Sequence, residues 1–225
     1  MAIIVEIRSA EGGADSRQLV REQTAIYMKA SARHGVILDV IESRPGAAVL
    51  RASGKGAVKL FEHEAGGHRH QRVPPNEKRG RVHTSTVTVA VLPVPSESEV
   101  QINERDLEWK TCRSNGPGGQ SVNTTDSAVQ VTHLPTGLQV RCESEKSQLQ
   151  NKEAARALLR ARLQQTATDR ADQERNGARK SQLGSGQRGD KTRTYRHQDD
   201  IVTDHSTGKK AALQRVLRGF LEDLW

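Results

Sequence analysis

The residues best suited to chemistry lie in one glycine-rich segment near the middle of this 225-residue chain. Residues 114–120 read Ser-Asn-Gly-Pro-Gly-Gly-Gln, with three glycines within four positions. A segment with so little side-chain volume can enter a narrow site and present its backbone N–H groups closely to a substrate. The tripeptide Gly118-Gly119-Gln120 on its own favours an ordinary glycine turn before a strand. The surrounding sequence has to decide between such a turn and a segment that enters a narrow site.

The glutamine limits what such a segment can do. Gln120 is neutral and cannot act as a general base at ordinary pH. The sequence also lacks a defensible Ser–His–Asp or Cys–His arrangement for a nucleophile. Any reaction here must depend on positioning and electrostatics, and it must borrow catalytic groups from a partner.

Two other patterns could suggest a cofactor. Residues 184–189 match the Gly-x-Gly-x-x-Gly fingerprint, but that fingerprint must follow a strand and open a helix. Here a basic helix is expected before it, which favours a flexible linker. His63, His68 and His70 lie among arginines without a convincing ligand spacing, so RNA contact or loop packing is the preferred interpretation. We expect no metal and no other cofactor.

Positive charge is concentrated in one fifth of the chain. The 35 Lys and Arg exceed the 27 Asp and Glu by eight, and residues 152–196 hold twelve basic and five acidic side chains. This concentration favours phosphate backbones as a partner, the alternative being a solvated helix face. With only 3 % aromatic residues, a single-strand stacking platform is not expected. Folded RNA is therefore the predicted partner.

The remaining composition excludes several classes of protein. No apolar run is long enough to cross a membrane, and Glu6 and Arg8 interrupt the apolar start too early for a signal peptide. Two cysteines, Cys112 and Cys142, cannot build a disulfide framework. We expect a cytoplasmic protein without a membrane partner.

Hydrophobic periodicity predicts a mixture of strands and helices. Strands are expected at residues 3–7, 36–41, 84–92, 128–133 and 138–142, and helices at 17–33, 151–166 and 210–225. The strands at 128–133 and 138–142 are expected to form a hairpin, with residues 134–137 as its turn. Gly66-Gly67 and Pro74-Pro75 are expected to mark loops around a polar stretch rich in His and Arg, and residues 93–99 have the composition of a linker. These elements predict an α+β fold with two units.

The setting of the glycine-rich segment resembles a known family. Residues 114–129 are similar to the GGQ segment of bacterial class I peptide chain release factors, and closer to release factor one than to release factor two. Further similar segments follow in order at residues 66–69, 71–74, 80–85, 132–137, 145–148, 184–186, 193–195 and 202–205. The resemblance implies a decoding-type α/β sandwich formed by residues 1–95 and 190–225. An inserted GGQ domain, residues 100–185, would hold a small sheet and a long basic helix.

The resemblance also implies a role for the glycine-rich segment. Gly118, Gly119 and Gln120 would enter the ribosomal peptidyl transferase centre and promote hydrolysis of the P-site peptidyl-tRNA ester. The Gln120 N–H would help to stabilise the developing oxyanion, and its side chain would help to select water. Hydrolysis is expected only on the ribosome, by a monomer. Gln120 is a candidate for N5-methylation by a glutamine methyltransferase.

Contacts with the mRNA codon are implied at Pro74, Pro75, Asn76, His83 and Thr84. Release factor one carries Pro-x-Thr at the first three positions, whereas Asn76 replaces the hydroxyl by a larger amide and Pro75 stiffens the segment. Ribosomal RNA contacts are expected from Arg156, Arg160, Arg162, Arg175, Arg179 and Lys180.

The family's N-terminal helical domain has no counterpart in this sequence. Termination with an altered stop-codon preference is the favoured interpretation. Codon-independent or specialised rescue of stalled ribosomes, and a non-hydrolytic regulator that occupies the A site, stay open as alternatives.

Overall fold

The computed structural model describes residues 2–94, 101–114, 125–183 and 189–225. The chain divides into two compact units, one formed by Met1–Pro95 with Arg175–Trp225 and the other by Ser96–Glu174. The division falls within a long helix, earlier in the chain than the expected boundary near residue 185. Val87 belongs to the core of the first unit and Val131 to that of the second.

The first unit is built on one twisted sheet whose described strands run in the order β11-β10-β9-β4-β5-β1-β3-β2. Neighbouring strands are antiparallel except β4 and β9, which are parallel. The strands are β1 (Ile3–Ser9), β2 (Ile37–Arg44), β3 (Ala47–Ser53), β4 (Gly66–Arg72), β5 (His83–Pro93), β9 (Arg193–Arg196), β10 (Ile201–Asp204) and β11 (Lys210–Ala212). The mixture of this sheet with the helices described below confirms the α+β class.

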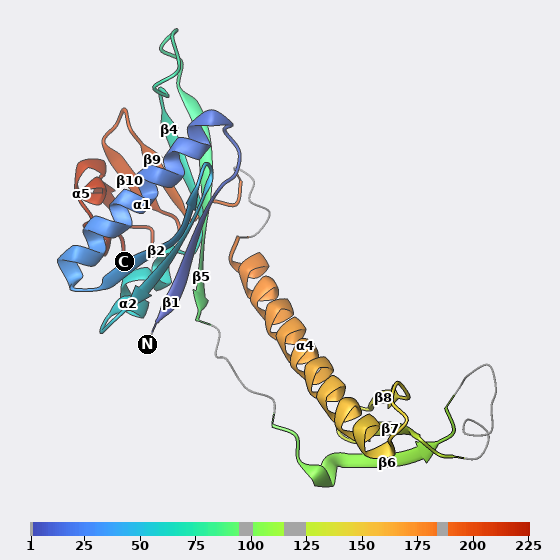
Figure 1. Ribbon diagram of the computed structural model, residues 1–225. Coiled ribbons are helices and arrows are strands. Elements are labelled where there is room, and N and C mark those ends of the chain that lie inside the picture. The colour runs from blue at the N-terminus through green and yellow to red at the C-terminus, as the bar shows by residue number, and fades with distance from the viewer. Residues whose placement is uncertain (1, 95–100, 115–124, 184–188) are drawn as a thin grey trace. The chain divides into compact units, whose positions relative to one another are not determined.

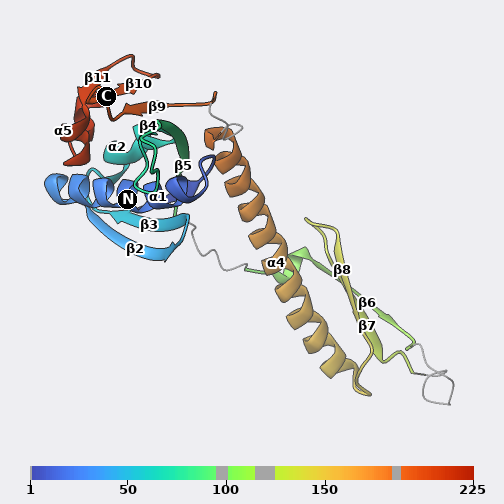
Figure 2. The same ribbon diagram turned by 90° about the horizontal axis from the view of Figure 1, so that it is seen from above.

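One long helix, α1 (Ala14–His34), crosses one face of this sheet (Figures 1 and 2). It buries Leu19, Ile26 and Tyr27 against β1, β3 and β5. The helix ends where Gly35 adopts a left-handed conformation with φ 65°, which glycine adopts without steric cost. The helix predicted at 17–33 is confirmed, with a short extension at each end.

Short helices complete the first unit. They are α2 (Ala57–Phe61), α5 (Leu213–Leu217) and the 3₁₀ turns Glu62–Glu64 and Leu221–Leu224. The single helix predicted over 210–225 is wrong, since the segment forms β11, α5 and a 3₁₀ turn. Gly219 interrupts it with a left-handed backbone conformation, φ 90°, and must be glycine because a Cβ there would lie 2.5 Å from the backbone nitrogen of Ala30.

Strand β4 corrects a second expectation, because Gly66 and Gly67, which were expected to mark a loop, begin a strand inside the sheet. Its backbone pairs with β5 on one side and with β9 on the other. His68 and His70 are buried on this strand. Both ring nitrogens of His68 have hydrogen-bond partners, whereas His70 stacks on Tyr195 and contacts His197 through Nδ1. Buried histidines thus occupy positions where apolar residues would have signalled a strand.

The second unit consists of a three-stranded antiparallel sheet covered by a helix. The strands β6 (Leu107–Cys112), β7 (Ala128–His133) and β8 (Leu138–Cys142) follow in this order, and the turn Glu104–Asp106 precedes them. The strands predicted at 128–133 and 138–142 are confirmed. The core is formed by Leu107, Val131, Val140, Ala155, Leu159 and Leu163.

Helix α4 (Gln148–Leu183) runs for 36 residues and contributes to both units. Its first part packs on the small sheet, and the part from Arg175 onward belongs to the first unit (Figure 1). The expected loss of helical structure after Thr166 is therefore wrong. Contacts of the last two turns with β1 and β5 support the additional length.

Candidate functional site

The loop between β4 and β5 brings the five predicted codon-contacting residues onto one edge of the first unit. The strands pair up to Arg72 and His83, so the chain between them forms the end of a hairpin. The Glu77 N–H donates to the Pro74 carbonyl at 3.0 Å, which closes a turn around Pro75 and Asn76. Pro74 is buried, whereas Pro75, Asn76 and His83 are exposed. The tip is thus shaped by its own backbone and presents polar groups to solvent.

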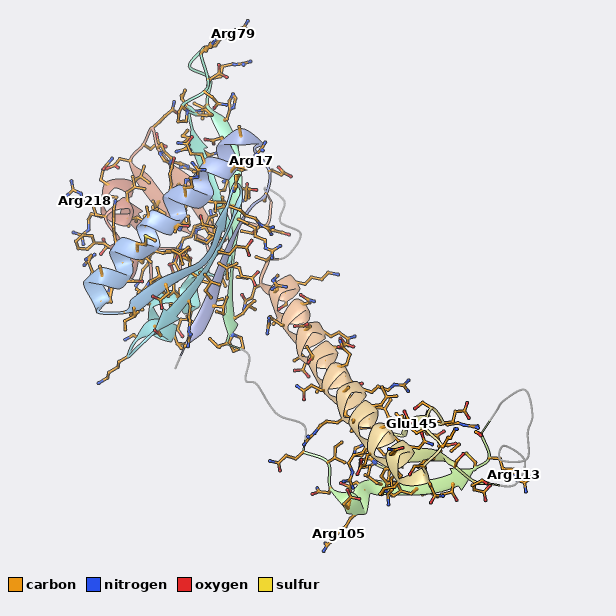
Figure 3. The ribbon with its side chains drawn as sticks, viewed as in Figure 1. Arg17, Arg79, Arg105, Arg113, Glu145 and Arg218 are labelled. Carbon is orange, nitrogen blue, oxygen red and sulfur yellow. The ribbon has the colours of Figure 1, made fainter. Side chains whose placement is uncertain are left out.

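Glu77 binds the rest of this loop from inside. Its carboxylate accepts hydrogen bonds from the Arg79 backbone N–H at 2.7 Å, from Arg81 Nη2 at 3.0 Å and from His83 Nε2 at 2.8 Å. The backbone hydrogen bond from Arg79, together with the Arg81 and His83 side chains, lowers the pKa of Glu77. The carboxylate is therefore charged at neutral pH. Figure 3 shows Arg79 projecting from the outer end of the loop.

Arg72 fixes the base of the loop to α1. Its guanidinium donates to Asp15 Oδ1 at 2.7 and 3.1 Å and to Glu22 Oε2 at 2.6 Å. Burial of Arg72 opposes its charge, but the hydrogen bonds to Asp15 and Glu22 outweigh it and raise the pKa of the guanidinium. Charge-assisted hydrogen bonds from one guanidinium to two carboxylates of α1 hold strand and helix in one geometry.

The segment before α1 also approaches the start of β5. The Thr86 N–H donates to the Glu11 carbonyl at 2.7 Å. At Gly12, with φ 126°, an added Cβ would lie 2.5 Å from the Ser85 hydroxyl oxygen. Only glycine allows this approach, so the N-terminal turn of α1 lies against the strand that carries His83 and Thr84.

Sequence reasoning missed a small hollow of about 360 Å³ beside the loop. Gln71 and Val82 line it from the hairpin, and Arg196, Gln198 and Asp199 line it from the β9–β10 turn. The parallel pairing of Gln71 with Arg196 brings these distant segments together. No local sequence pattern signals such a pairing. The hollow offers side-chain donors and acceptors from Gln71, Arg196, Gln198 and Asp199, and Val82 in its lining directly precedes His83 in sequence.

A buried polar cluster lies behind β4. Arg193 forms ion pairs with Glu64 and with Asp204, and all three side chains are fully buried. Tyr27 donates to Glu64 at 3.0 Å, and His68 lies 3.1 Å from the Tyr195 hydroxyl. These partners give the charged groups the hydrogen bonds that burial demands. The cluster stabilises the sheet that carries the loop.

The histidines considered as metal ligands have structural roles. Burial lowers the pKa of His68 to about 4, and burial also lowers the pKa of His70 far below its usual value. The His70 ring stacks on Tyr195 with 4.1 Å between centroids, and exposed His63 stacks on Trp225. Within the described ranges no group of three His, Cys, Asp or Glu is arranged to hold a metal ion. The expectation from sequence is RNA contact or loop packing; the structure instead packs His68 and His70 inside strand β4.

Gly118, Gly119 and Gln120 lie outside the described residues. The structure describes the two strands that flank them, β6 and β7, which are paired through Cys112 and Ala128. Arg113 projects at this end of the second unit (Figure 3).

Asn151, a residue that sequence reasoning did not single out, ties this end of the sheet to α4. Its side-chain amide donates to the carbonyls of Ser127 and Glu145, both at 2.8 Å, and accepts from the Glu145 N–H at 3.0 Å. Gln148 adds a hydrogen bond to the Asp126 carbonyl at 2.9 Å. The chain leading into β7 is thereby anchored to the first turn of the helix.

The six basic residues predicted to contact RNA all lie on α4. Arg156, Arg160 and Arg162 are exposed on its first part; Arg156 is paired with Glu104, and Arg162 donates to the Gln139 carbonyl at 3.2 Å. Lys180 is exposed near the other end. The remaining two, Arg175 and Arg179, are half-buried there.

Arg179 has a structural partner in the first unit. Its guanidinium donates to both oxygens of Glu6 in β1, at 2.6 and 2.8 Å. This bidentate pair fixes the end of α4 to the sheet.

In the described part of the chain no helix is long and apolar enough to span a membrane.

Comparisons with known proteins agree along the whole chain. A family model described as the PCRF domain matches residues 1–89, and one described as the RF-1 domain matches residues 96–206. Peptide chain release factor 1 of Myxococcus xanthus is 42% identical over 229 residues, covering 99% of this chain and 63% of that protein. Peptide chain release factor 1 of Thermotoga maritima is 42% identical over 228 residues, covering 98% and 67%.

A solved structure gives the same result. RF2 of Thermus thermophilus matches with a TM-score of 0.57 and 35% identity, covering 99% of this chain and 65% of that one. The chain spans about two thirds of the length of the curated relatives it matches. Sequence and structure agree in one conclusion: this chain belongs to the peptide chain release factor family.

Proposed function

We propose that this chain acts in the ribosomal A site and promotes release of the nascent peptide during translation termination. The observation that carries the proposal is the pre-shaped loop from Pro74 to His83, fixed from inside by Glu77 and at its base by Arg72. In this family, a loop presenting polar groups on a rigid hairpin suits the reading of a codon. We assign this role to the first unit, and peptidyl-tRNA hydrolysis to the second.

In the proposed reaction, water attacks the carbonyl carbon of the peptidyl-tRNA ester. The ester oxygen leaves as the 3′ hydroxyl of the tRNA. Gly118 and Gly119 allow the backbone to approach the ester, and the Gln120 N–H stabilises the oxygen on which negative charge develops. The Gln120 side chain orients the water. Because an amide is no base, the groups that move protons come from the ribosome.

We assign codon contacts to Pro74, Pro75, Asn76, His83 and Thr84. The exposed amide of Asn76 offers both a donor and an acceptor where the release factor one pattern has a hydroxyl. A misplaced hydrogen bond to a base costs about 1–3 kcal/mol of discrimination. We therefore propose that stop codons influence release, with a relaxed or altered preference among them.

Ribosomal RNA is the proposed partner of the exposed cations of α4. Arg156, Arg160, Arg162 and Lys180 are exposed, which supports assigning phosphate contacts to them, and Arg175 is half-buried. Arg179 differs because Glu6 holds its guanidinium, so we assign it to positioning the helix. Methylation of Gln120, a monomeric state and a cytoplasmic location belong to the same proposal.

Asn76 is the observation that favours a second candidate function, the rescue of stalled ribosomes without a stop codon. A third candidate is a regulator that occupies the A site without hydrolysis. Release of labelled peptide from ribosomes carrying P-site peptidyl-tRNA separates the third from the other two.

The Gly119→Ala variant tests the assignment of the reaction. We expect the added Cβ to prevent close approach and to lower the rate of release by about a hundredfold or more, while binding to the ribosome stays near normal. Gly177→Ala is the matched control, since a Cβ at this helical position meets open space and release should be unchanged. Undiminished release by Gly119→Ala would contradict the proposed role of the segment.

A further inference from the structure

We infer that Glu77 is a positioning residue for codon reading: it holds the β4–β5 loop and the His83 ring in their codon-contacting arrangement before the ribosome is met. The inference rests on the proposed function and deepens it, because it names the group that gives the loop its shape. Glu77 acts through the residues that it binds and is not assigned a contact with the codon.

The first argument is the number and direction of its hydrogen bonds. Arg79, Arg81 and His83 follow Glu77 at alternating positions, and each donates to the same carboxylate. The donors are a backbone N–H, a guanidinium and an imidazole, so the carboxylate fixes both the main chain and two side chains. Hydrogen bonds to a charged acceptor are stronger than those between neutral groups.

The second argument is the contrast in exposure within the loop. The Glu77 side chain is 6% exposed, while Arg81 is 64% exposed and His83 is 46% exposed. The donors thus remain open to solvent on their outer sides, and the acceptor is enclosed between them. The carboxylate shapes the loop while leaving the outer face of His83 available to a ligand.

The third argument is electrostatic. A loop that meets mRNA and ribosomal RNA faces a high density of negative charge, which a free carboxylate would repel. In this loop the negative charge of Glu77 is surrounded by Arg81 and His83 and by the Arg79 N–H. Glu77 can therefore lie in an RNA-facing loop, because donors from the same loop already bind its carboxylate.

These contacts have a consequence for affinity. A loop already held in its bound shape loses less conformational entropy when it binds. Without Glu77, three donors lose their shared acceptor and the His83 ring can leave its position. We therefore expect Glu77 to contribute to codon affinity and discrimination and not to the rate of ester hydrolysis.

The test measures peptide release at increasing factor concentration on ribosomes programmed with a stop codon or a sense codon. The variants are Glu77→Ala and Glu77→Gln, which keeps the size of the side chain but loses its charge. The control is Glu42→Ala, on the edge strand β2, which removes a surface partner of Arg44. Thermal unfolding checks that each variant is folded.

For both Glu77 variants we expect the half-saturating concentration on stop codons to rise about tenfold. The rate at saturation should stay as in the unchanged protein, and the preference for stop over sense codons should fall. Glu42→Ala should change none of these. Combining Glu77→Ala with His83→Ala should add little to the effect of the stronger single change, because both act through one ring.

Hydrogen exchange of the free protein gives a second readout that needs no ribosome. The Arg79 amide should be protected in the unchanged protein and should exchange faster in Glu77→Ala. Wild-type half-saturation and discrimination in both folded Glu77 variants would overturn the inference and leave the proposed function intact. Absence of release by the unchanged protein would overturn the proposed function, and the inference with it.

Discussion

Gln182, in the last turn of α4, hydrogen-bonds both backbone polar groups of Val91 in β5. The Val91 N–H donates to Gln182 Oε1 and the Gln182 amide donates to the Val91 carbonyl, both at 2.8 Å. Strand β4 begins opposite Val89, so among the described strands none continues beside Val91 on that side. The glutamine side chain takes the place of a strand residue there and fixes the end of the helix to the sheet.

Gln182→Ala should lower the free energy of unfolding of the first unit by about 1–3 kcal/mol, because the two Val91 groups lose their partner. Gln173→Ala is the matched control: the same substitution at an exposed position of the same helix. Chemical denaturation followed by circular dichroism measures both. Equal unfolding midpoints for the two variants would contradict the role given to Gln182.

Acidification should destabilise the first unit through His68. The folded state lowers the pKa of this histidine to about 4, whereas the unfolded chain binds the proton near its usual pKa of about 6.5. The unfolded state therefore gains protons first as the pH falls. Stability should drop by about 3 kcal/mol between pH 7 and pH 4, and His70, whose pKa is also lowered, adds in the same direction.

Urea unfolding at several pH values measures this dependence. His68→Gln should be less stable than the unchanged protein at pH 7 but should lose less stability on the way to pH 4. His133→Gln, in the second unit, should leave the pH dependence of the first unit unchanged. A flat pH dependence in the unchanged protein would show that His68 does not titrate in this way.

Salt dependence should separate the arginines of α4 by role. Arg160→Ala removes an exposed cation and should reduce the slope of log affinity for ribosomes against log salt by up to about one. Arg179→Ala should leave that slope almost unchanged and lower the unfolding midpoint, because Glu6 loses its bidentate partner. The same change of slope for both variants would remove the distinction drawn here.

Asn76→Thr should sharpen discrimination between stop codons. The substitution restores the hydroxyl of the release factor one pattern at the tip of the loop, within the turn closed between Pro74 and Glu77. We expect the preference for UAA and UAG over UGA to rise by about tenfold, in line with one repaired base contact. Pro75→Ala, at the neighbouring exposed position, is the control, and release rates on the three codons are compared. An unchanged ratio would exclude Asn76 from codon reading.

The elements with regular side-chain patterns could be predicted from sequence. Strands β7 and β8 alternate strictly around a Pro-Thr-Gly turn, and they form where that pattern places them. Strand β4 was missed because His68 and His70, not apolar residues, face the core. The part of α4 after Thr166 was missed because its surface is polar and its end is supported by Glu6 and Val91, which are remote in sequence.

The candidate site likewise contains residues that could be predicted from the sequence and residues that could not. The family resemblance implied that Pro74, Asn76 and His83 act together, and the structure places them at one end of the β4–β5 hairpin. The role of Glu77 could not be predicted, because it depends on a turn that directs three later donors to one carboxylate. The hollow lined by Arg196 depends on a parallel strand pairing that leaves no local trace in the sequence.

In the proposed function, a stop codon controls release by this chain. The most direct measurement is the rate of peptide release on ribosomes carrying UAA, UAG, UGA, a sense codon or an empty A site. We predict faster release on one or more stop codons than on the sense codon or the empty site, and a shift in that pattern for Asn76→Thr. Equal release on empty and stop-programmed A sites, unmoved by the substitution, would contradict it and identify a rescue factor.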